Sequence, residues 1–246
     1  MKLTLISDVH ANLHALEAVI VHAQSLGAAE QILNLGDFVG YGAFPEAVVQ
    51  RLFALNAVSV IGDYDQKVLN RKNIGNDWAR VKVPDKRLAF RYAYENLSPN
   101  SRAKLMMIPE TRNLSLEGIS ILMTHGSPES ILDHIGPETS IERLNELAEM
   151  AAADVVLCGN THVPFVKMVA RTTFINPGSV GRPDDGDPRA SYAILDVEGE
   201  HLDIQFFRVD YDLEAALTGI RENGLPEIFA QMLLEGRNYM DVIKNI

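Results

Sequence analysis

Residues able to bind metal ions recur along this sequence, and each group of them directly follows a short apolar run. They carry carboxylate, imidazole or amide groups: Asp8, His10, Asp37, Asp63, His125, Asn160 and His162. Such a mixed set suits Mn, Fe, Zn or a similar ion, and one carboxylate can bridge two ions. A lone Asp-x-His pair means little, but five such groups in one chain indicate a divalent-metal site.

The apolar runs that precede these residues fit buried strands. They are short and rich in Val, Ile and Leu, and they span residues 3–6, 32–35, 58–61, 119–123 and 155–158. Helical patterns lie between several of them, at residues 11–25, 45–55 and 139–152. This alternation implies an α/β layered fold, in which ligands bind beyond the carboxyl ends of the strands. The polar groups are therefore predicted to converge.

The spacing within two groups suggests how their side chains point. If strand geometry continues past the apolar run, residues two apart share one face of the sheet. This would place Asp8 beside His10, and Asn160 beside His162.

The rest of the chain divides into two further regions. Residues 65–108 are charged and predicted to be helical, either as a cap over the site or as an insertion packed against the sheet edge. From about residue 164 the pattern favours strands at residues 164–169, 172–175, 191–197 and 202–209, and the tail from residue 212 predicts two short helices. Without an internal repeat or linker, we expect a single domain over residues 1–246.

Composition narrows the classes of partner. The net charge of −11 and pI near 5.1 argue against a nucleic acid duplex and an anionic membrane, since both bind basic surfaces. A small phosphate ester remains compatible, because a bound metal inverts the local field. The single cysteine, Cys158, excludes an internal disulfide, and the N-terminal apolar run is too short for a signal peptide. We expect a soluble cytoplasmic protein, of an oligomeric state that the sequence does not indicate.

Five motifs carry a family resemblance. They are Asp8-Val-His10-Ala-Asn12, Gly36-Asp37-Phe-Val-Gly40-Tyr41-Gly42, Thr124-His125-Gly126, Gly159-Asn160-Thr161-His162 and Asn176-Pro-Gly-Ser-Val-Gly. In order and spacing they resemble those of the calcineurin-like metallophosphoesterase superfamily, and most of all its small single-domain prokaryotic members. These include phosphodiesterases and relatives of diadenosine tetraphosphatase. The resemblance runs from residue 2 to about residue 209.

The resemblance implies a four-layer α/β/β/α sandwich with one or two divalent ions. The first ion would be held by residues matching Asp8, His10, Asp37 and His162. The second would share Asp37 and add residues matching Asp63, His125 and Asn160. Mn, Fe, Zn or Ni is expected, with Mg an option at the second site. The implied reaction is hydrolysis of a phosphomonoester or phosphodiester, with nucleotides among the candidates, by a metal-bound hydroxide. Asp37 and Tyr64 are the expected catalytic residues.

The chain departs from the family pattern at the second ion. The third motif is normally Gly-Asn-His followed by Asp or Glu, and here it is Gly62-Asp63-Tyr64-Asp65; in the last motif, normally Gly-His-x-His, Asn160 replaces the first histidine. The ligands of the second site are therefore harder and more negative than those of the family pattern, or else this site binds its ion weakly or not at all. A tyrosine, with a pKa of about 10, is a poorer proton shuttle near neutrality than an imidazole at about 6.5. We expect reduced turnover, or substrates with good leaving groups.

Several of these residues have a second interpretation. Asp63 is either a ligand or the N-cap of the helix that follows, and Asn160 is either a ligand or a turn residue. Asn12 is either a phosphate contact or part of a local turn. Arg182 either reaches the substrate phosphate or forms an exposed ion pair. For the whole protein, the alternative to an enzyme is a non-hydrolytic binding or scaffold protein with a degraded second metal site.

Overall fold

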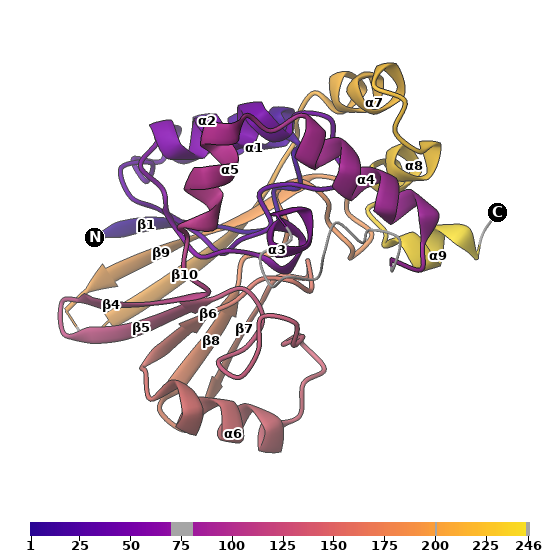
Figure 1. Ribbon diagram of the computed structural model, residues 1–246. Helices are drawn as coiled ribbons and strands as arrows, with labels where there is room; N and C mark the ends of the chain where they lie inside the picture. Colours follow the sequence, from indigo (N-terminus) through magenta and orange to yellow (C-terminus); the bar gives the residue numbers. More distant parts are fainter. Residues whose placement is uncertain (70–80, 200, 245–246) are drawn as a thin grey trace.

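A computed structural model describes residues 1–69, 81–199 and 201–244. Its strands form two five-stranded sheets, with helices on the outer sides (Figure 1). The first sheet has the order β10-β9-β1-β2-β3. Its strands are β1 (Lys2–Ile6), β2 (Ile32–Asn34), β3 (Val58–Ser59), β9 (Ala190–Glu198) and β10 (His201–Val209). Strands β1, β2 and β3 run parallel, so their carboxyl ends lie at one edge.

The second sheet has the order β4-β5-β6-β8-β7. Its strands are β4 (Thr111–Leu116), β5 (Ile119–Thr124), β6 (Val155–Leu157), β7 (Phe165–Val169) and β8 (Thr172–Asn176). Here β5, β6 and β8 run parallel. Strand β4 was missed in the sequence, because its side chains are mostly exposed and polar and so lack an apolar run.

The layers form the predicted α/β/β/α sandwich. Leu5 of β1 and Leu157 of β6 belong to one apolar core between the sheets. On the outer side of the first sheet, Ile6 packs with Leu16 and Val48 from α1 (Leu13–Ser25) and α2 (Pro45–Ala54). Helix α6 (Ile141–Ala151) covers the second sheet. Because β1 is buried on both faces, it appears in the sequence as a continuous apolar run.

Within residues 65–108, the described part forms helix α3 (Asp63–Leu69), which begins just before it, α4 (Pro84–Glu95) and α5 (Pro99–Met106). Their side chains Val68, Phe90 and Leu105 belong to the same apolar core as α1 and α2. This part therefore packs as a helical insertion over the first sheet, and it also supplies Lys67 and Lys86 to the cavity described below. Residues 70–80 of the insertion lie outside the described residues.

The tail contains three described helices, so the prediction of two is wrong. They are α7 (Leu213–Glu222), α8 (Glu227–Glu235) and α9 (Tyr239–Ile243). Gly236, with φ of 60°, ends α8, and the Asn238 side chain then caps α9 by accepting hydrogen bonds from two backbone N–H groups. A five-residue helix is too short to show a helical period. Across the described ranges, no helix has the length and apolar character needed to cross a bilayer.

Candidate metal centre

The polar groups that follow the strands converge at one edge of the sandwich. Candidate ligand atoms of Asp8, His10 and His162 lie within 4.8 Å of one another, and so do those of Asp8, Asp37 and His125. These residues follow β1, β2, β5 and β6, which belong to different sheets. The convergence predicted from the strand ends is confirmed.

Three histidines are oriented by backbone carbonyl groups. The Nδ1 atom of His10 lies 3.2 Å from the Val39 oxygen, that of His125 lies 2.7 Å from the Leu35 oxygen, and that of His162 lies 2.6 Å from the Arg182 oxygen. Each carbonyl can only accept, so Nδ1 carries the proton and Nε2 is left for the centre. The protein thereby fixes the tautomer that a metal ligand needs.

Asp37 lies between the two groups of ligand atoms. Its Oδ2 atom is 3.6 Å from His10 Nε2, and its Oδ1 atom is 3.6 Å from His125 Nε2. On the first side, His162 Nε2 is 3.1 Å from Asp8 Oδ1. On the second, Asp63 Oδ1 is 3.7 Å from His125 Nε2. A carboxylate so placed can offer one oxygen to each of two ions.

Unpartnered buried atoms show that these residues fit a cation. Asp8 Oδ1, Asp63 Oδ1 and His125 Nε2 are buried and have no hydrogen-bond partner in the described structure. Leaving such a group unsatisfied costs on the order of 1–3 kcal/mol, and more when it is charged. The orphaned atoms face one another and are all metal-ligand types, so divalent ions would satisfy them together.

Burial and neighbouring charges shift the pKa values of the centre strongly. Burial alone would raise the pKa of Asp8, but three nearby histidines, His162 foremost, hold it well below its usual range. Burial raises the pKa of Asp37, and the surrounding carboxylates raise it further, against the influence of His125. Burial would lower the pKa of His125, but Asp37 and other carboxylates raise it to about 10. Bound cations would offset the repulsion between these closely packed carboxylates.

The ligand positions depend on an unusual backbone. All five candidate ligands that follow β1, β2 and β6 have φ in the left-handed region: Asp8 54°, His10 47°, Asp37 54°, Asn160 66° and His162 60°. The expectation that strand geometry continues past β1 and β6 is therefore wrong. Left-handed turns aim these side chains instead, and the two loops secure each other through Asp8 N–H to Gly36 O (3.0 Å) and His10 N–H to Asp37 O (2.9 Å).

Two glycines allow the loops to approach closely. A Cβ atom on Gly62 would lie 2.0 Å from Asp37 Oδ1, and one on Gly159 would lie 2.0 Å from Ser7 Oγ and 2.9 Å from Asp8 Oδ2. No side chain fits at those distances. Gly62 is thus required by the close approach of the Asp37 carboxylate, and Gly159 by that of the Ser7 hydroxyl.

Tyr64 and Asn160 occupy the positions where the motifs depart from the family. The Tyr64 N–H donates to Asp37 Oδ1 at 2.9 Å, and its hydroxyl shares a hydrogen bond with that of Tyr41. Burial raises the pKa of Tyr64 well above its usual value, so its hydroxyl stays protonated. The Asn160 side-chain nitrogen donates to the Asp133 oxygen at 3.0 Å, which leaves Oδ1 as its possible ligand atom. This bond joins Asn160 to the loop of residues 131–133 and not to its own turn, so it is not the local turn bond expected as its alternative role.

Asp65 is a structural member of the centre that was not predicted from the sequence. It is fully buried, and its two oxygens accept from the N–H groups of Val39 (3.1 Å) and Gly62 (3.0 Å). Burial raises its pKa to about 6, although these backbone bonds oppose the rise. It ties the loop bearing Asp37 to the start of α3. Its place in the Gly62-Asp63-Tyr64-Asp65 motif was the available signal.

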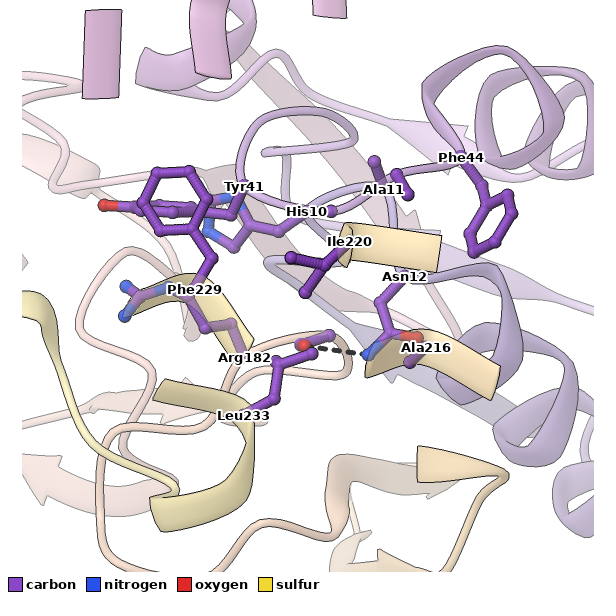
Figure 2. Close-up of a pocket in the computed structure, with 13 residues that line it drawn as sticks. His10, Ala11, Asn12, Tyr41, Phe44, Arg182, Ala216, Ile220, Phe229 and Leu233 are labelled. Atoms are coloured by element: carbon purple, nitrogen blue, oxygen red, sulfur yellow. Dashed lines mark hydrogen bonds between the residues drawn. The ribbon is translucent and has the colours of Figure 1, made fainter. Parts of the chain in front are cut away.

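Of the two roles expected for Asn12, the structure shows the local one. Its Oδ1 accepts from the Ala15 N–H at 3.1 Å, as N-cap of α1, and its Nδ2 donates to the Gly181 oxygen at 3.0 Å (Figure 2). Both ends of the amide are committed to the backbone. A phosphate contact from this side chain therefore has no support in the structure.

Arg182 lies beside the centre, and the exposed ion pair expected as its alternative role is wrong. It is only 8% exposed; Nη1 donates to Asp184 at 2.7 Å and Nη2 lies 3.4 Å from His162 Nε2. Its guanidinium lies 4.6 Å from the centre of the Tyr41 ring (Figure 2). The position suits a contact to a phosphate at the metal centre.

A cavity of about 340 Å³ opens over the centre. Its walls include Asp37, Asp63, Asn160 and His162, together with Lys67, Lys86, Arg182, Tyr64, Asn238, Tyr239 and Met240. A second hollow lies where Phe229 and Ile220, from α8 and α7, pack on the loop of His10 (Figure 2). It has only about 10 Å³ of space, roughly enough for one water and too little for a phosphate ester.

Comparison with known proteins gives the class. Residues 1–200 match the calcineurin-like phosphoesterase superfamily domain. That range contains the whole metal centre, so the chain belongs to this family, and the resemblance noted in its motifs is confirmed. The family and the ligand groups together imply binding of divalent metal ions and hydrolysis of phosphoesters.

Individual relatives agree with this assignment. The chain is 30% identical to an uncharacterized protein of Methanocaldococcus jannaschii, over 96% of this chain and 98% of that one. It is 31% identical to phosphodiesterase YfcE of Escherichia coli K12, over 80% and 88%. A metallophosphoesterase from Sphaerobacter thermophilus, 31% identical, has the same fold with a TM-score of 0.80, over 96% of this chain and 99% of that one.

Proposed function

We propose that this protein hydrolyses a small phosphate ester at a two-metal centre. The observation that carries the proposal is the Asp37 carboxylate, which turns one oxygen toward His10 and the other toward His125. Ions bound on both sides would supply charge neutralisation for the phosphate and an activated water. The unpartnered atoms of Asp8, Asp63 and His125 support ions on both sides.

The surrounding residues have separate roles in this proposal. Arg182 neutralises a phosphate oxygen from the cavity wall, in a fixed orientation set by Asp184. Tyr64 donates a hydrogen bond from its hydroxyl to the leaving oxygen, since its raised pKa keeps the proton in place. Asp65 holds the Asp37 loop at the required distance from α3.

The second ion site favours a hard cation. Its donors would be carboxylate oxygens of Asp37 and Asp63, the Oδ1 of Asn160 and the imidazole of His125. Compared with the family pattern, Asn160 offers an amide in place of an imidazole, and Asp63 offers a carboxylate in place of an amide. Oxygen donors suit Mn²⁺ or Mg²⁺, so we propose Mn²⁺ as the activating ion.

The test measures turnover of 4-nitrophenyl phosphate and bis(4-nitrophenyl) phosphate with Mn²⁺. Asp37→Asn should lower kcat/KM on the preferred ester by about 100-fold or more, because it weakens both sides of the centre. Asp203→Asn, which changes an exposed carboxylate on β10, is the matched control and should leave turnover unchanged. Metal binding without any turnover would instead support the alternative, a non-hydrolytic binding protein.

A further inference from the structure

Lys86 is placed in an unusual environment on the cavity wall. Its ammonium lies 6.0 Å, 5.9 Å and 5.8 Å from the ring centres of Tyr41, Tyr64 and Tyr239. The side chain is half-buried, and no carboxylate of the described residues forms an ion pair with it. Three aromatic faces stabilise a cation only modestly, by about 0.5–1 kcal/mol each at exposed sites. A charge held inside a cavity without an anion is positioned to receive one.

Neighbouring contacts build this position. The Tyr239 hydroxyl donates to Asp85 Oδ2 at 2.8 Å, which joins α9 to α4 next to Lys86. Tyr239 is 8% exposed, and its bond to Asp85 is partly buried. The Tyr41 and Tyr64 rings stack with centroids 5.1 Å apart, and their hydroxyls are hydrogen-bonded to each other. Residues from three segments thus fix the space in front of the ammonium.

The other cations of the cavity already have partners. Lys67 pairs with Asp63, and Arg182 pairs with Asp184 while lying beside His162. A phosphate at the metal centre would be neutralised by the ions and by Arg182. Lys86 comes from a different helix, α4, and adds a positive charge that this phosphate does not require.

We propose that Lys86 binds a second anionic group of the substrate, one that lies beyond the phosphate at the metal centre. This inference rests on the proposed function of the site and narrows its substrate class. The substrate is then a small molecule with two anionic groups, most simply an organic diphosphate. A monoanionic dialkyl phosphate would leave Lys86 without a partner.

Three stable ligands test this, because each carries one phosphonate and differs in the second group. Methylphosphonate has no second anion, methylenediphosphonate has a phosphonate and phosphonoacetate has a carboxylate. Dissociation constants are measured by calorimetry on the Mn²⁺-loaded protein. Lys86→Met should raise the dissociation constant of methylenediphosphonate about tenfold and change that of methylphosphonate by less than about twofold. A loss confined to phosphonoacetate would show that the second anion is a carboxylate and would overturn the diphosphate assignment.

The control is Lys104→Met, which removes an exposed lysine that also lies over one aromatic ring, that of Phe53, but outside the cavity. It should change no constant. Lys86→Arg keeps the charge, so it should still bind methylenediphosphonate more tightly than methylphosphonate. Thermal unfolding checks that each variant folds. Equal weakening of all three ligands by Lys86→Met, or no weakening, would overturn the proposal.

The outcome is separable from the proposed hydrolysis. Ligand binding with the expected dependence on Lys86 but no turnover of any ester would support the anion site and count against the hydrolase. Turnover without that dependence would support the hydrolase and overturn the anion site.

Discussion

Asp63 and Lys67, one turn apart on α3, form an ion pair at the edge of the metal centre. Asp63 stands where the family motif normally has an asparagine, so it adds a negative charge to a centre already crowded with carboxylates. Lys67, whose side chain is 40% exposed, offsets that charge through Asp63 Oδ2. The other oxygen, Oδ1, has no hydrogen-bond partner in the described structure and faces His125.

The first prediction concerns competition for Asp63. Lys67→Met should tighten binding of the second Mn²⁺ about two- to fivefold, because a partly exposed ion pair contributes no more than about 1 kcal/mol. Calorimetric titration of metal-free protein would measure it, with Lys104→Met as a matched loss of charge outside the cavity. Weaker binding of the second ion in the Lys67 variant would show that the lysine does not compete.

The second prediction concerns protons released by metal binding. Carboxylates raise the pKa of His125 to about 10, so at pH 8 the metal-free protein holds a proton that a metal must displace. At least one proton should be released per chain, as read from binding heats in buffers of different ionisation enthalpy. His125→Gln should release fewer. Heats independent of the buffer would contradict the prediction.

The same shift sets the sign of a stability change. A folded-state pKa raised from 6.5 to about 10 contributes stability that is full below about pH 6.5 and lost as pH rises through about 10. The contribution of His125 to the stability of the metal-free protein should therefore fall between pH 7 and 10. The loss should be smaller in His125→Gln, as measured by urea unfolding.

The third prediction concerns the leaving group. Burial raises the pKa of Tyr64, so it is a weaker general acid toward an alkoxide leaving group than an imidazolium would be. Tyr64→His should raise turnover of an alkyl phosphate ester about tenfold relative to a 4-nitrophenyl ester. Tyr64→Phe keeps the ring but lacks the donor, and should slow the alkyl ester selectively. A histidine variant no faster than wild type on the alkyl ester would refute this role.

The fourth prediction isolates backbone strain away from the site. Ala152 ends α6 with φ of 45° and is exposed, so Ala152→Gly should stabilise the protein by about 1 kcal/mol. Its neighbour Ala151 is the last residue of the helix and packs against the core of the second sheet, so Ala151→Gly should destabilise by about 1 kcal/mol. For a chain of this size each change moves Tm by about 2–4 °C. Shifts of the same sign in both variants would contradict the argument.

The sequence predicted the parts of the site that depend on strand ends. Residues such as Asp37 and His125 follow buried strands, and parallel strands bring their ends to one edge, so the convergence could be predicted from the sequence alone. The local backbone conformation could not be predicted, since the left-handed turns at Asp8 and His10 are set by contacts between loops. Lys86 and Tyr239 were missed because α4 and α9 reach the cavity through tertiary packing, which leaves no periodic signal.

The left-handed turns also set a conflict between what the chain needs to be stable and what it needs to bind. Glycine and asparagine accept φ near 60° most readily, whereas aspartate and histidine do so at some cost. A lineage released from metal binding would therefore gain stability by losing its ligands at positions 8, 10, 37 and 162. At position 160, with φ of 66°, this chain already has asparagine in place of the histidine of the family motif. That one exchange eases the backbone while keeping an oxygen that can bind a metal ion.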